Sequence, residues 1–346
     1  MKMMMVECLL SVTIPFCVLA HSVSYTLHVE DFESGQSLHD MPCETIFTTH
    51  TGDWNDMSRG HLEKGVTNAD GDFKFKGVSD ISHVTFSIRT EGGMYYPVIR
   101  KRLEFNEISG WVNKCWEPYD TIVTVRLQRV EHPIPLCVKN VRPKVAPGTF
   151  DGTNAVLRYD LVLGDWLPPE GKGECADLEI RTKLTIDEVL QVGKHKDWKK
   201  TFFTFSNTVR FLGEGNGCRA EMTSPTAGIK FRIAPEDGYG NMIRMRQGTQ
   251  KTMNGPNAYA KKFTDSDPNR CYYFRIRSRF DNKGNLVEAY YGKIYGDFNF
   301  HGHWSCGYQG VSFLYYLNPK SLDRNLEWDM KTNLSPDPGS IGQRMP

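Results

Sequence analysis

The stretch GVTNADGDFKFKG, from Gly65 to Gly77, decides the fold prediction. Phe73 and Phe75 alternate with lysines, and side chains of a β-strand point alternately to two faces, so the pattern predicts a half-buried strand. Asp70-Gly71, just before this run, supplies the positive φ angles that a tight turn requires. The stretch therefore predicts a hairpin whose phenylalanines face a core and whose lysines face water.

A calcium loop is the alternative for this segment, because Asn68, Asp70 and Asp72 place oxygen atoms at alternate positions. A loop of the EF-hand type needs a glutamate at its twelfth position, and the twelfth residue from Asn68 is Ser79. We therefore interpret the segment as a turn, and we expect no cofactor in this protein.

The composition favours short strands separated by turns. The 346 residues include 12% aromatic residues, 31 glycines and 18 prolines, which is typical of β-rich proteins. The 42 basic and 41 acidic residues leave a formal charge of +1. No overall field attracts a polyanion, so we expect no nucleic-acid partner, and any polyanionic ligand would need a local patch.

The N-terminus has the pattern of a signal peptide. Lys2 precedes an apolar run that ends at Val18-Leu19-Ala20, with small residues where a signal peptidase cleaves. We predict a signal peptide over residues 1–20, a mature chain from His21 and an exported protein, extracellular or periplasmic, with no integral membrane span after cleavage. An uncleaved anchor is the alternative.

The mature chain holds seven cysteines, namely Cys43, Cys115, Cys137, Cys175, Cys218, Cys271 and Cys306. None has the C-x-x-C spacing of common zinc and thioredoxin-like sites, and export favours disulfides. An odd number leaves at least one thiol outside any intramolecular pair. Small buried cysteines are the alternative, and the sequence does not select a connectivity.

The alternating segments predict two β-domains. Residues 22–130 contain several short strands and predict a small β-sandwich, and residues 151–334 predict a larger β-rich sandwich or barrel-like domain. Residues 131–150 are rich in proline, which predicts a linker. The Pro-, Gly- and Ser-rich end, 335–346, predicts a flexible tail, and residues 1–20 form the signal.

Two sequence motifs support the N-terminal prediction. Asp31 to Gly35 is followed by Leu38, and Thr67 to Gly71 is followed by Phe73-Lys-Phe75. In these motifs the chain resembles the carboxypeptidase regulatory-like domain, a transthyretin-like Greek-key sandwich. The resemblance implies a fold without catalytic residues, because such domains accompany peptidases, transporters and adhesive proteins alike. The remainder is similar to secreted bacterial proteins, which implies no activity.

Three arginines share one face of a predicted strand over residues 272–280, namely Arg275, Arg277 and Arg279. Such a row can hold carboxylates or sulfates of an acidic glycan through bidentate hydrogen bonds. The alternative is structural. A hairpin loop at residues 281–284 would pair Arg277 with Glu288 and Arg275 with Tyr290, which would neutralise part of the row.

Trp166 is a further candidate for ligand binding, because adjacent prolines and glycines make a rigid turn that can present its ring to a sugar. A tryptophan that plugs the edge of a sandwich is the alternative. His301 and His303 are candidate metal ligands, since residues two apart on a strand share a face, and Cys306 is a nearby thiolate. An ordinary half-buried strand is the alternative there.

The motifs of the common catalytic classes are absent: G-x-S-x-G, H-E-x-x-H, the P-loop and G-x-G-x-x-G do not occur. We predict a secreted, non-enzymatic binding or surface module whose ligand is an extracellular carbohydrate or a cell-envelope protein. One alternative is a structural envelope protein. The other is a secreted, glycosidase-like hydrolase in which two carboxylates of the second domain converge, from Asp165, Glu170, Asp177, Glu236 and Asp237.

Overall fold

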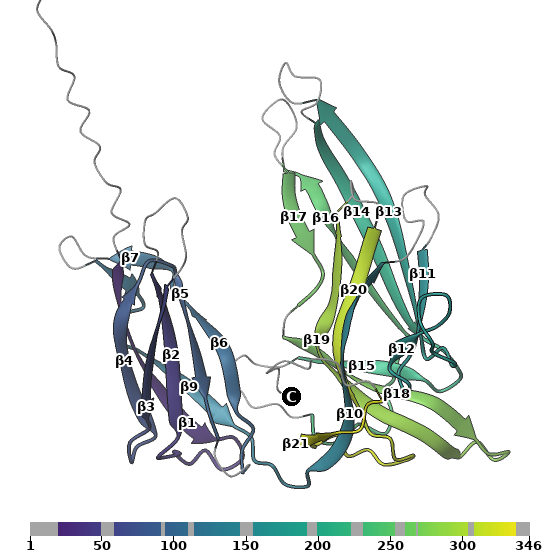
Figure 1. The fold of residues 1–346 in the computed structure, drawn as a ribbon, viewed down its shortest axis with the longest axis horizontal. Coiled ribbons are helices and arrows are strands. Elements are labelled where there is room, and N and C mark those ends of the chain that lie inside the picture. The colour runs from purple at the N-terminus through teal and green to yellow at the C-terminus, as the bar shows by residue number, and fades with distance from the viewer. Residues whose placement is uncertain are drawn as a thin grey trace, which may run out of the picture. The chain divides into compact units, whose positions relative to one another are not determined.

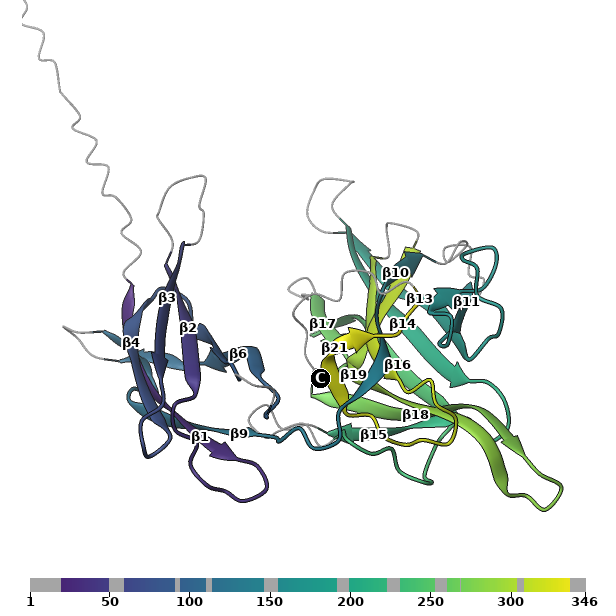
Figure 2. The ribbon, with the colours of Figure 1, turned by 60° about the horizontal axis from the view of Figure 1, so that its bottom comes forward.

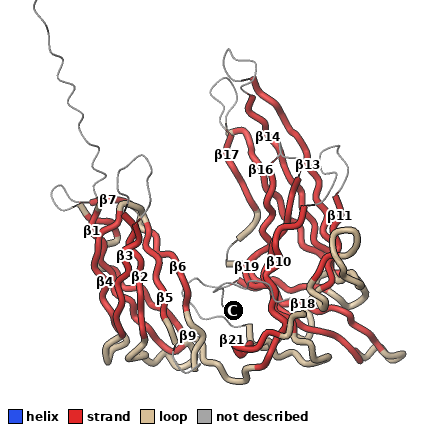
Figure 3. The backbone as a smooth tube through the Cα atoms, viewed as in Figure 1, coloured by secondary structure: helices blue, strands red, loops and turns tan. Residues whose placement is uncertain are grey.

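The computed structural model of the protein is built from strands. It describes residues 20–49, 59–90, 94–109, 114–145, 155–191, 199–222, 231–252, 260–267, 269–303 and 308–336. Every regular element in these residues is a strand (Figure 3), which confirms the mainly β prediction; none is a helix that could cross a membrane. The predicted signal peptide 1–20 and tail 335–346 fall almost entirely outside the described residues.

The chain divides into two compact units, coloured along the sequence in Figure 1. Unit 1 comprises Met1–Glu91 and Pro97–Leu127, and unit 2 comprises Gly92–Tyr96 and Gln128–Pro346. The short segment Gly92–Tyr96 therefore belongs to unit 2, although it lies within the range 22–130 that the sequence assigns to the first domain.

Unit 1 is formed by two sheets. Its strands are β1 His21–Asp31, β2 Pro42–Thr49, β3 Arg59–Val66, β4 Asp72–Ser79, β5 His83–Ile88, β6 Val98–Glu104, β7 Glu107–Ser109, β8 Cys115–Glu117 and β9 Thr121–Leu127. One sheet has the order β4-β1-β8-β7, with β9 parallel to β1, and the other has the order β3-β2-β5-β6.

The two sheets of unit 1 pack face to face. Tyr25 in β1 is fully buried, and its hydroxyl donates to Thr45 Oγ1 in β2 across the interface at 2.7 Å. Phe47 of β2 lies so close to Gly77 of β4 that a Cβ added there would meet its ring at 2.7 Å. Burial of these aromatic rings between two sheets is the physical basis of a β-sandwich.

The stretch from Gly65 to Gly77 forms the predicted turn, but the hairpin prediction is wrong. Asn68 Oδ1 accepts the backbone N–H groups of Asp70 at 3.0 Å and Asp72 at 2.8 Å, so its oxygen serves the turn. Phe75 is buried and the lysines are exposed, as predicted. The turn nevertheless connects β3, which pairs with β2, to β4, which pairs with β1 in the other sheet.

Gly71 provides a test of this turn. Its φ is +79°, and an added Cβ would lie 2.6 Å from the Val29 carbonyl oxygen, whereas Gly35 has φ +68° in open space. We expect Gly35→Ala to cost about 1 kcal/mol of unfolding free energy, from backbone strain alone, and Gly71→Ala about 2–4 kcal/mol. Urea denaturation of the mature chain measures both. Equal costs would contradict the close approach of Gly71 to β1.

Unit 2 is formed by two six-stranded sheets. Its strands are β10 Ile134–Val145, β11 Ala155–Asp160, β12 Asp165–Trp166, β13 Leu178–Gln191, β14 Lys199–Phe211, β15 Gly217–Met222, β16 Met242–Lys251, β17 Ala260–Thr264, β18 Arg270–Phe280, β19 Leu286–His303, β20 Tyr308–Leu317 and β21 Trp328–Asn333. Sheet I has the order β15-β18-β19-β20-β10-β21, and sheet II has the order β12-β11-β13-β14-β16-β17.

The main core of unit 2 lies between sheets I and II. Sheet I contributes Phe274 and Phe313, and sheet II contributes Ile180 and Phe211, all nearly fully buried. The alternate residues of β18 and β20 point to the other face of sheet I, where Tyr273 and Tyr316 belong to two smaller apolar clusters. Strands β18 and β20 are therefore buried on both faces, and both sets of their alternate residues include aromatic rings.

The predicted linker 131–150 is wrong for its central part. Ile134–Val145 forms strand β10, which pairs with β20 and β21 inside sheet I. Pro135 and Pro143 each lie at a shift in the pairing register. A proline lacks a backbone N–H, and a residue at a bulge does not need to donate one to the neighbouring strand. Both prolines are therefore accommodated within β10.

Candidate functional site

The arginine row predicted on β18 does not form. Arg275 donates through Nε to the Gly215 carbonyl at 2.8 Å, Arg277 binds buried carboxylates, and Arg279 donates to Glu288 at 2.9 Å. The pairing register shifts between Ile276 and Arg279, and Arg277 has a φ of +52°. This bulge sends successive guanidiniums in different directions, so the three do not share one face.

The predicted pairing across the hairpin is also wrong, although its loop is correct. The Asp281 N–H donates to the Asn285 carbonyl at 2.9 Å, which closes the predicted loop. Glu288 pairs with Arg279, which lies two residues after the expected partner Arg277. Arg275 lies over the ring of Tyr239 at 4.8 Å, and its cross-strand partner is Tyr291 where Tyr290 was expected.

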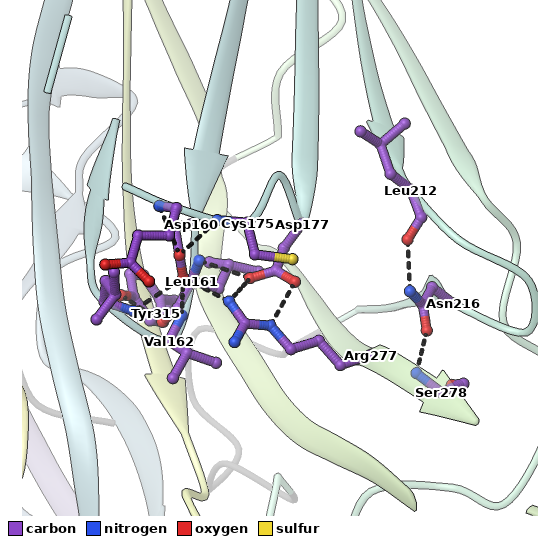
Figure 4. Close-up of polar contacts among 12 residues, drawn as sticks. Asp160, Leu161, Val162, Cys175, Asp177, Leu212, Asn216, Arg277, Ser278 and Tyr315 are labelled. Carbon is purple, nitrogen blue, oxygen red and sulfur yellow. Dashed lines mark hydrogen bonds and ion pairs between the residues drawn. The ribbon is translucent and has the colours of Figure 1, made fainter. Parts of the chain in front are cut away.

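Arg277 instead joins the two sheets of unit 2 through a buried network, here called the Arg277 clamp (Figure 4). Its Nη2 lies 2.6 Å from Asp160 Oδ1 and 3.1 Å from Asp177 Oδ2, and its Nε lies 3.0 Å from Asp177 Oδ1. The two aspartates are 1% and 2% exposed. A guanidinium fork matches a carboxylate in this bidentate geometry, so the clamp is a strong, directional contact.

The two aspartates also organise the chain between β11 and β13. Asp160 accepts backbone N–H groups from both ends of this segment, including Leu163 at 2.9 Å and Cys175 at 3.0 Å, and Asp177 accepts that of Leu161 at 2.9 Å. Every carboxylate oxygen of the clamp therefore has a donor, which buried charges require.

Burial and hydrogen bonding move the two carboxyl pKa values in opposite directions. Burial raises the pKa of Asp160, but the N–H groups of Leu163 and Cys175 and the charge of Arg277 outweigh it and lower the pKa overall. At Asp177 burial is the larger effect, and it raises the pKa despite the bonds from Arg277. Opposite pKa shifts in two neighbouring carboxyls are typical of catalytic acid–base pairs. Here, however, the oxygens of both carboxyls already accept hydrogen bonds from Arg277 and from backbone N–H groups.

Cys175 lies beside the clamp, as Figure 4 shows, and it is exposed. Burial of its sulfur and the nearby aspartates raise the pKa of this thiol, although Arg277 opposes them. Reactive cysteines are thiolates stabilised by positive charge, whereas Cys175 stays protonated at neutral pH. The charge of Arg277 therefore does not lower the pKa of this thiol below its ordinary value.

The clamp predicts unequal roles for two arginines of one strand. Arg277→Gln leaves two buried carboxylates without a counter-charge, and we expect a loss of about 3–5 kcal/mol of unfolding free energy. Arg279→Gln, the control, removes an exposed pair and should cost about 0–1 kcal/mol. Urea denaturation of the mature chain measures both, and equal losses would refute the clamp.

The same variant has a pH signature. Without Arg277 the folded-state pKa values of Asp160 and Asp177 rise. The loss of unfolding free energy is fully present above these pKa values, where both carboxylates are charged. The loss becomes smaller as the pH falls through them and the carboxyls become neutral. The gap between Arg277→Gln and the parent chain should therefore narrow from about pH 7 to about pH 4.

Trp166 does not present its ring to a ligand. It is 6% exposed and packs edge to face on Tyr159 at 4.9 Å inside the main core of unit 2. The prediction of a binding platform is wrong, and the alternative of a plug is correct. Burial of a large ring at the short edge strand β12 excludes water from the end of the core.

Three of the five carboxylates of the hydrolase alternative, Asp165, Asp177 and Glu236, make separate contacts. Asp165 accepts the backbone N–H groups of Trp166 and Lys172 within its own turn, and Glu236 is exposed and pairs with Arg324 at 2.9 Å. Asp177 binds Arg277 and shares it with Asp160, a carboxylate that the hydrolase alternative did not include. No contact in the described residues joins two of the five.

The candidate metal ligands are described only in part. His301 in β19 is exposed, and its Nε2 lies 2.9 Å from Ser312 Oγ on β20. The side chain of His303 and all of Cys306 lie outside the described residues. Within the described part of the chain no group of three His, Cys, Asp or Glu side chains could hold a metal ion, so the metal site stays a prediction.

Five of the predicted mature cysteines are free thiols in the structure: Cys43, Cys115, Cys137, Cys175 and Cys218. Burial raises the pKa of Cys43 and of Cys218 to about 12. These two thiols therefore behave as small apolar core residues, as the alternative reading of the cysteine pattern expects.

Lys293 is a buried ionisable group that was not among the candidate residues of the sequence. It belongs to β19, is 3% exposed, and its Nζ lies 3.4 Å from the Phe231 carbonyl and 5.0 Å from the centre of the Tyr316 ring. Burial lowers its pKa to about 7. The signal was available in the sequence, since Lys293 alternates with Tyr291 and Tyr295 on an otherwise aromatic face.

Lys293 gives stability a distinct pH dependence. Between about pH 7 and pH 10 the unfolded chain binds a proton that the folded chain lacks, so the unfolding free energy rises with pH by up to about 1.4 kcal/mol per unit. The destabilisation that the buried Lys293 causes is largest below its folded-state pKa, where the folded chain must bury a charged ammonium group. Lys293→Met should abolish this slope, whereas the exposed control Lys320→Met should keep it. Urea denaturation across this range measures the difference, and parallel profiles for both variants would contradict the burial.

The outer face of sheet II carries a positive surface that no sequence pattern predicted. Exposed cations occupy positions that alternate with the core residues of this sheet, and we call them the basic face: Arg158 in β11, Arg181 and Lys183 in β13, Arg210 in β14, and Arg244 and Arg246 in β16. The four strands are neighbours in the sheet (Figure 2).

The pairing register arranges these cations in adjacent rows. The rows are Arg158–Glu179–Arg210, Arg181–Thr208–Arg244 and Lys183–Ser206–Arg246. Neighbouring strands lie about 4.8 Å apart, and same-face positions along a strand lie about 6.7 Å apart. The Cα atom of each cation therefore lies within about 10 Å of another.

Glu179 fixes the orientation of two of these arginines. It accepts hydrogen bonds from Arg158 Nη2 at 3.1 Å and from Arg181 Nε at 2.8 Å. The bond from Arg181 is the main cause that holds the pKa of Glu179 below its usual value. The Arg158 and Arg181 side chains nevertheless remain 53% and 48% exposed. Their guanidiniums are thus both oriented and accessible.

The basic face keeps an excess of positive charge in the described part of the chain. Its other carboxylates are Asp265, which pairs with Arg246, and Asp187, which accepts the Thr204 hydroxyl. No described carboxylate forms an ion pair with the remaining cations, Lys183, Arg210 and Arg244. The excess is local, because the whole chain has a formal charge of only +1.

Comparisons with known proteins add little. No family model matches the chain, and no curated protein matches it. Among solved structures, a double mutant of the shaft pilin SpaA from Lactobacillus rhamnosus GG is similar at 9% sequence identity and a TM-score of 0.17, covering 59% of this chain and 92% of that one. A TM-score this low carries no argument about fold or function.

Proposed function

We propose that this protein is an exported, non-enzymatic binding module that acts outside the cytoplasm, with a carbohydrate as its ligand. The observation that carries the proposal is the basic face, which sets oriented, exposed guanidiniums on four neighbouring strands. A rigid sheet presents side chains at fixed spacings, which favours recognition of an extended ligand with repeated groups.

The buried ionisable groups support binding over catalysis. Asp160 and Asp177 are saturated by Arg277 and backbone donors, and Cys175 is held as a neutral thiol. A catalytic carboxylate or thiol needs contact with a substrate and a pKa suited to its task. The residues best placed to meet an external molecule are instead the exposed cations of the basic face.

Unit 1 belongs to the same proposal as an accessory sandwich of the carboxypeptidase regulatory-like type. The proposal rests on the motif from Asp31 to Gly35 and on the segment from Thr67 to Phe75. Asp31 supports it, since its carboxylate caps the turn by accepting the Ser34 N–H at 2.7 Å. Such a unit contributes a folded scaffold and no catalytic group.

Export is tested through the N-terminus. When the full chain is expressed in a Gram-negative host, we expect a periplasmic protein whose intact mass is that of a chain beginning at His21. Val12→Arg interrupts the apolar run that the export machinery binds, so this variant should keep Met1 and remain in the cytoplasm. A parent chain that also keeps Met1 in the cytoplasm would contradict export.

The binding role is tested with the mature chain against a panel of glycans and cell-envelope fractions. We expect saturable binding to at least one carbohydrate, without release of new reducing ends. If no member of the panel binds, the result would contradict a binding module. Catalytic turnover of a bound glycan would favour the hydrolase alternative.

A further inference from the structure

We infer that the basic face is a binding site for a linear acidic polysaccharide, whose carboxylate or sulfate groups pair with guanidiniums on neighbouring strands. This inference rests on the proposed function and names its ligand class. The glycan chemistry expected for the arginines of β18 is thereby assigned to a different surface, formed by Arg158, Arg181, Lys183, Arg210, Arg244 and Arg246.

The spacing of the cations favours a chain with repeated negative charges. Arg181 and Arg244 flank Thr208 in one row, and Lys183 and Arg246 flank Ser206 in the next. A single small anion would use only one or two of these groups. A linear polyanion can place successive charges on several rows, and its contacts then add along the chain.

The guanidinium groups suit carboxylates and sulfates in particular. Glu179 already orients Arg158 and Arg181, so little side-chain freedom is lost when they bind a ligand. Arg210 and Arg244 make no ion pair with a described carboxylate, so their charge is available without breaking an existing pair. Charge-assisted bidentate bonds from arginine to planar or tetrahedral oxyanions are short and strong.

The residues between the cations favour a polysaccharide over a nucleic acid. Ser206 and Thr208 lie between cations in their rows, and their hydroxyls can donate to and accept from sugar hydroxyls. Proteins that bind single-stranded nucleic acid place aromatic rings among their cations for base stacking. The three rows of the basic face contain no aromatic residue.

The test measures binding of the mature chain to heparin, a sulfated chain, and to polygalacturonate, a carboxylated chain. Neutral dextran and single-stranded DNA serve as comparison ligands. We expect affinity for both acidic polysaccharides that falls as salt rises, and none for dextran. DNA should bind at least about tenfold more weakly than heparin, because stacking contacts are missing.

Matched double variants separate the basic face from overall charge. Arg210→Glu with Arg244→Glu reverses two cations of the face, and we expect at least about a tenfold loss of affinity. Lys283→Glu with Lys331→Glu changes the net charge by the same amount, but away from the basic face. Lys283 is exposed in the loop between β18 and β19, and Lys331 is exposed in β21 of sheet I. This control should stay within about twofold of the parent. Circular dichroism and urea midpoints confirm that both variants fold.

The outcomes distinguish the inference from the proposed function. Equal losses in the two double variants, or equal affinity for DNA, would overturn the polysaccharide site. Binding to a neutral glycan or an envelope fraction without binding to either acidic chain would overturn the site and leave the proposed function standing. Failure to bind any member of the whole panel would refute both.

Discussion

Unit 2 depends on one guanidinium that faces the wrong way for a regular strand. Arg277 adopts a φ of +52°, a conformation that costs a residue with a side chain about 1–2 kcal/mol. The bulge turns it from β18 toward Asp160 and Asp177, and the Ser278 N–H beside it donates to Asn216 Oδ1 at 2.8 Å (Figure 4). The strain is offset because breaking a buried ion pair costs about 3–5 kcal/mol.

The clamp and the basic face use the same chemistry for opposite purposes. Arg277 meets two carboxylates that are nearly fully buried and whose every oxygen has a donor, and it therefore closes the end of a core. Arg210 and Arg244 stand on an exposed sheet face without a carboxylate partner in the described chain. A guanidinium that is satisfied inside the fold stabilises it, whereas one left unpaired in water is available to an external anion.

Sequence periodicity predicted individual strands better than it predicted their neighbours. Phe75 lies in the core as its alternation indicates, and Gly71 makes the expected turn. The strands on either side of that turn nevertheless enter different sheets, because a turn sequence specifies local φ angles and not the hydrogen-bonding partner. Prolines predicted a linker at residues 131–150, yet bulges accommodate Pro135 and Pro143 within β10.

The sequence by itself determined the β class, the turn at Gly71 and the inward face of the half-buried strand β4, since all three follow from local backbone geometry and a period of two. Only the tertiary structure decided that Arg277 meets Asp160 and Asp177, because a single bulge changes which way a side chain points. It also placed Arg158, Arg210 and Arg244 on one face of neighbouring strands, with Glu179 between Arg158 and Arg210. Strand pairing joins residues far apart in the chain, and no local pattern encodes that choice.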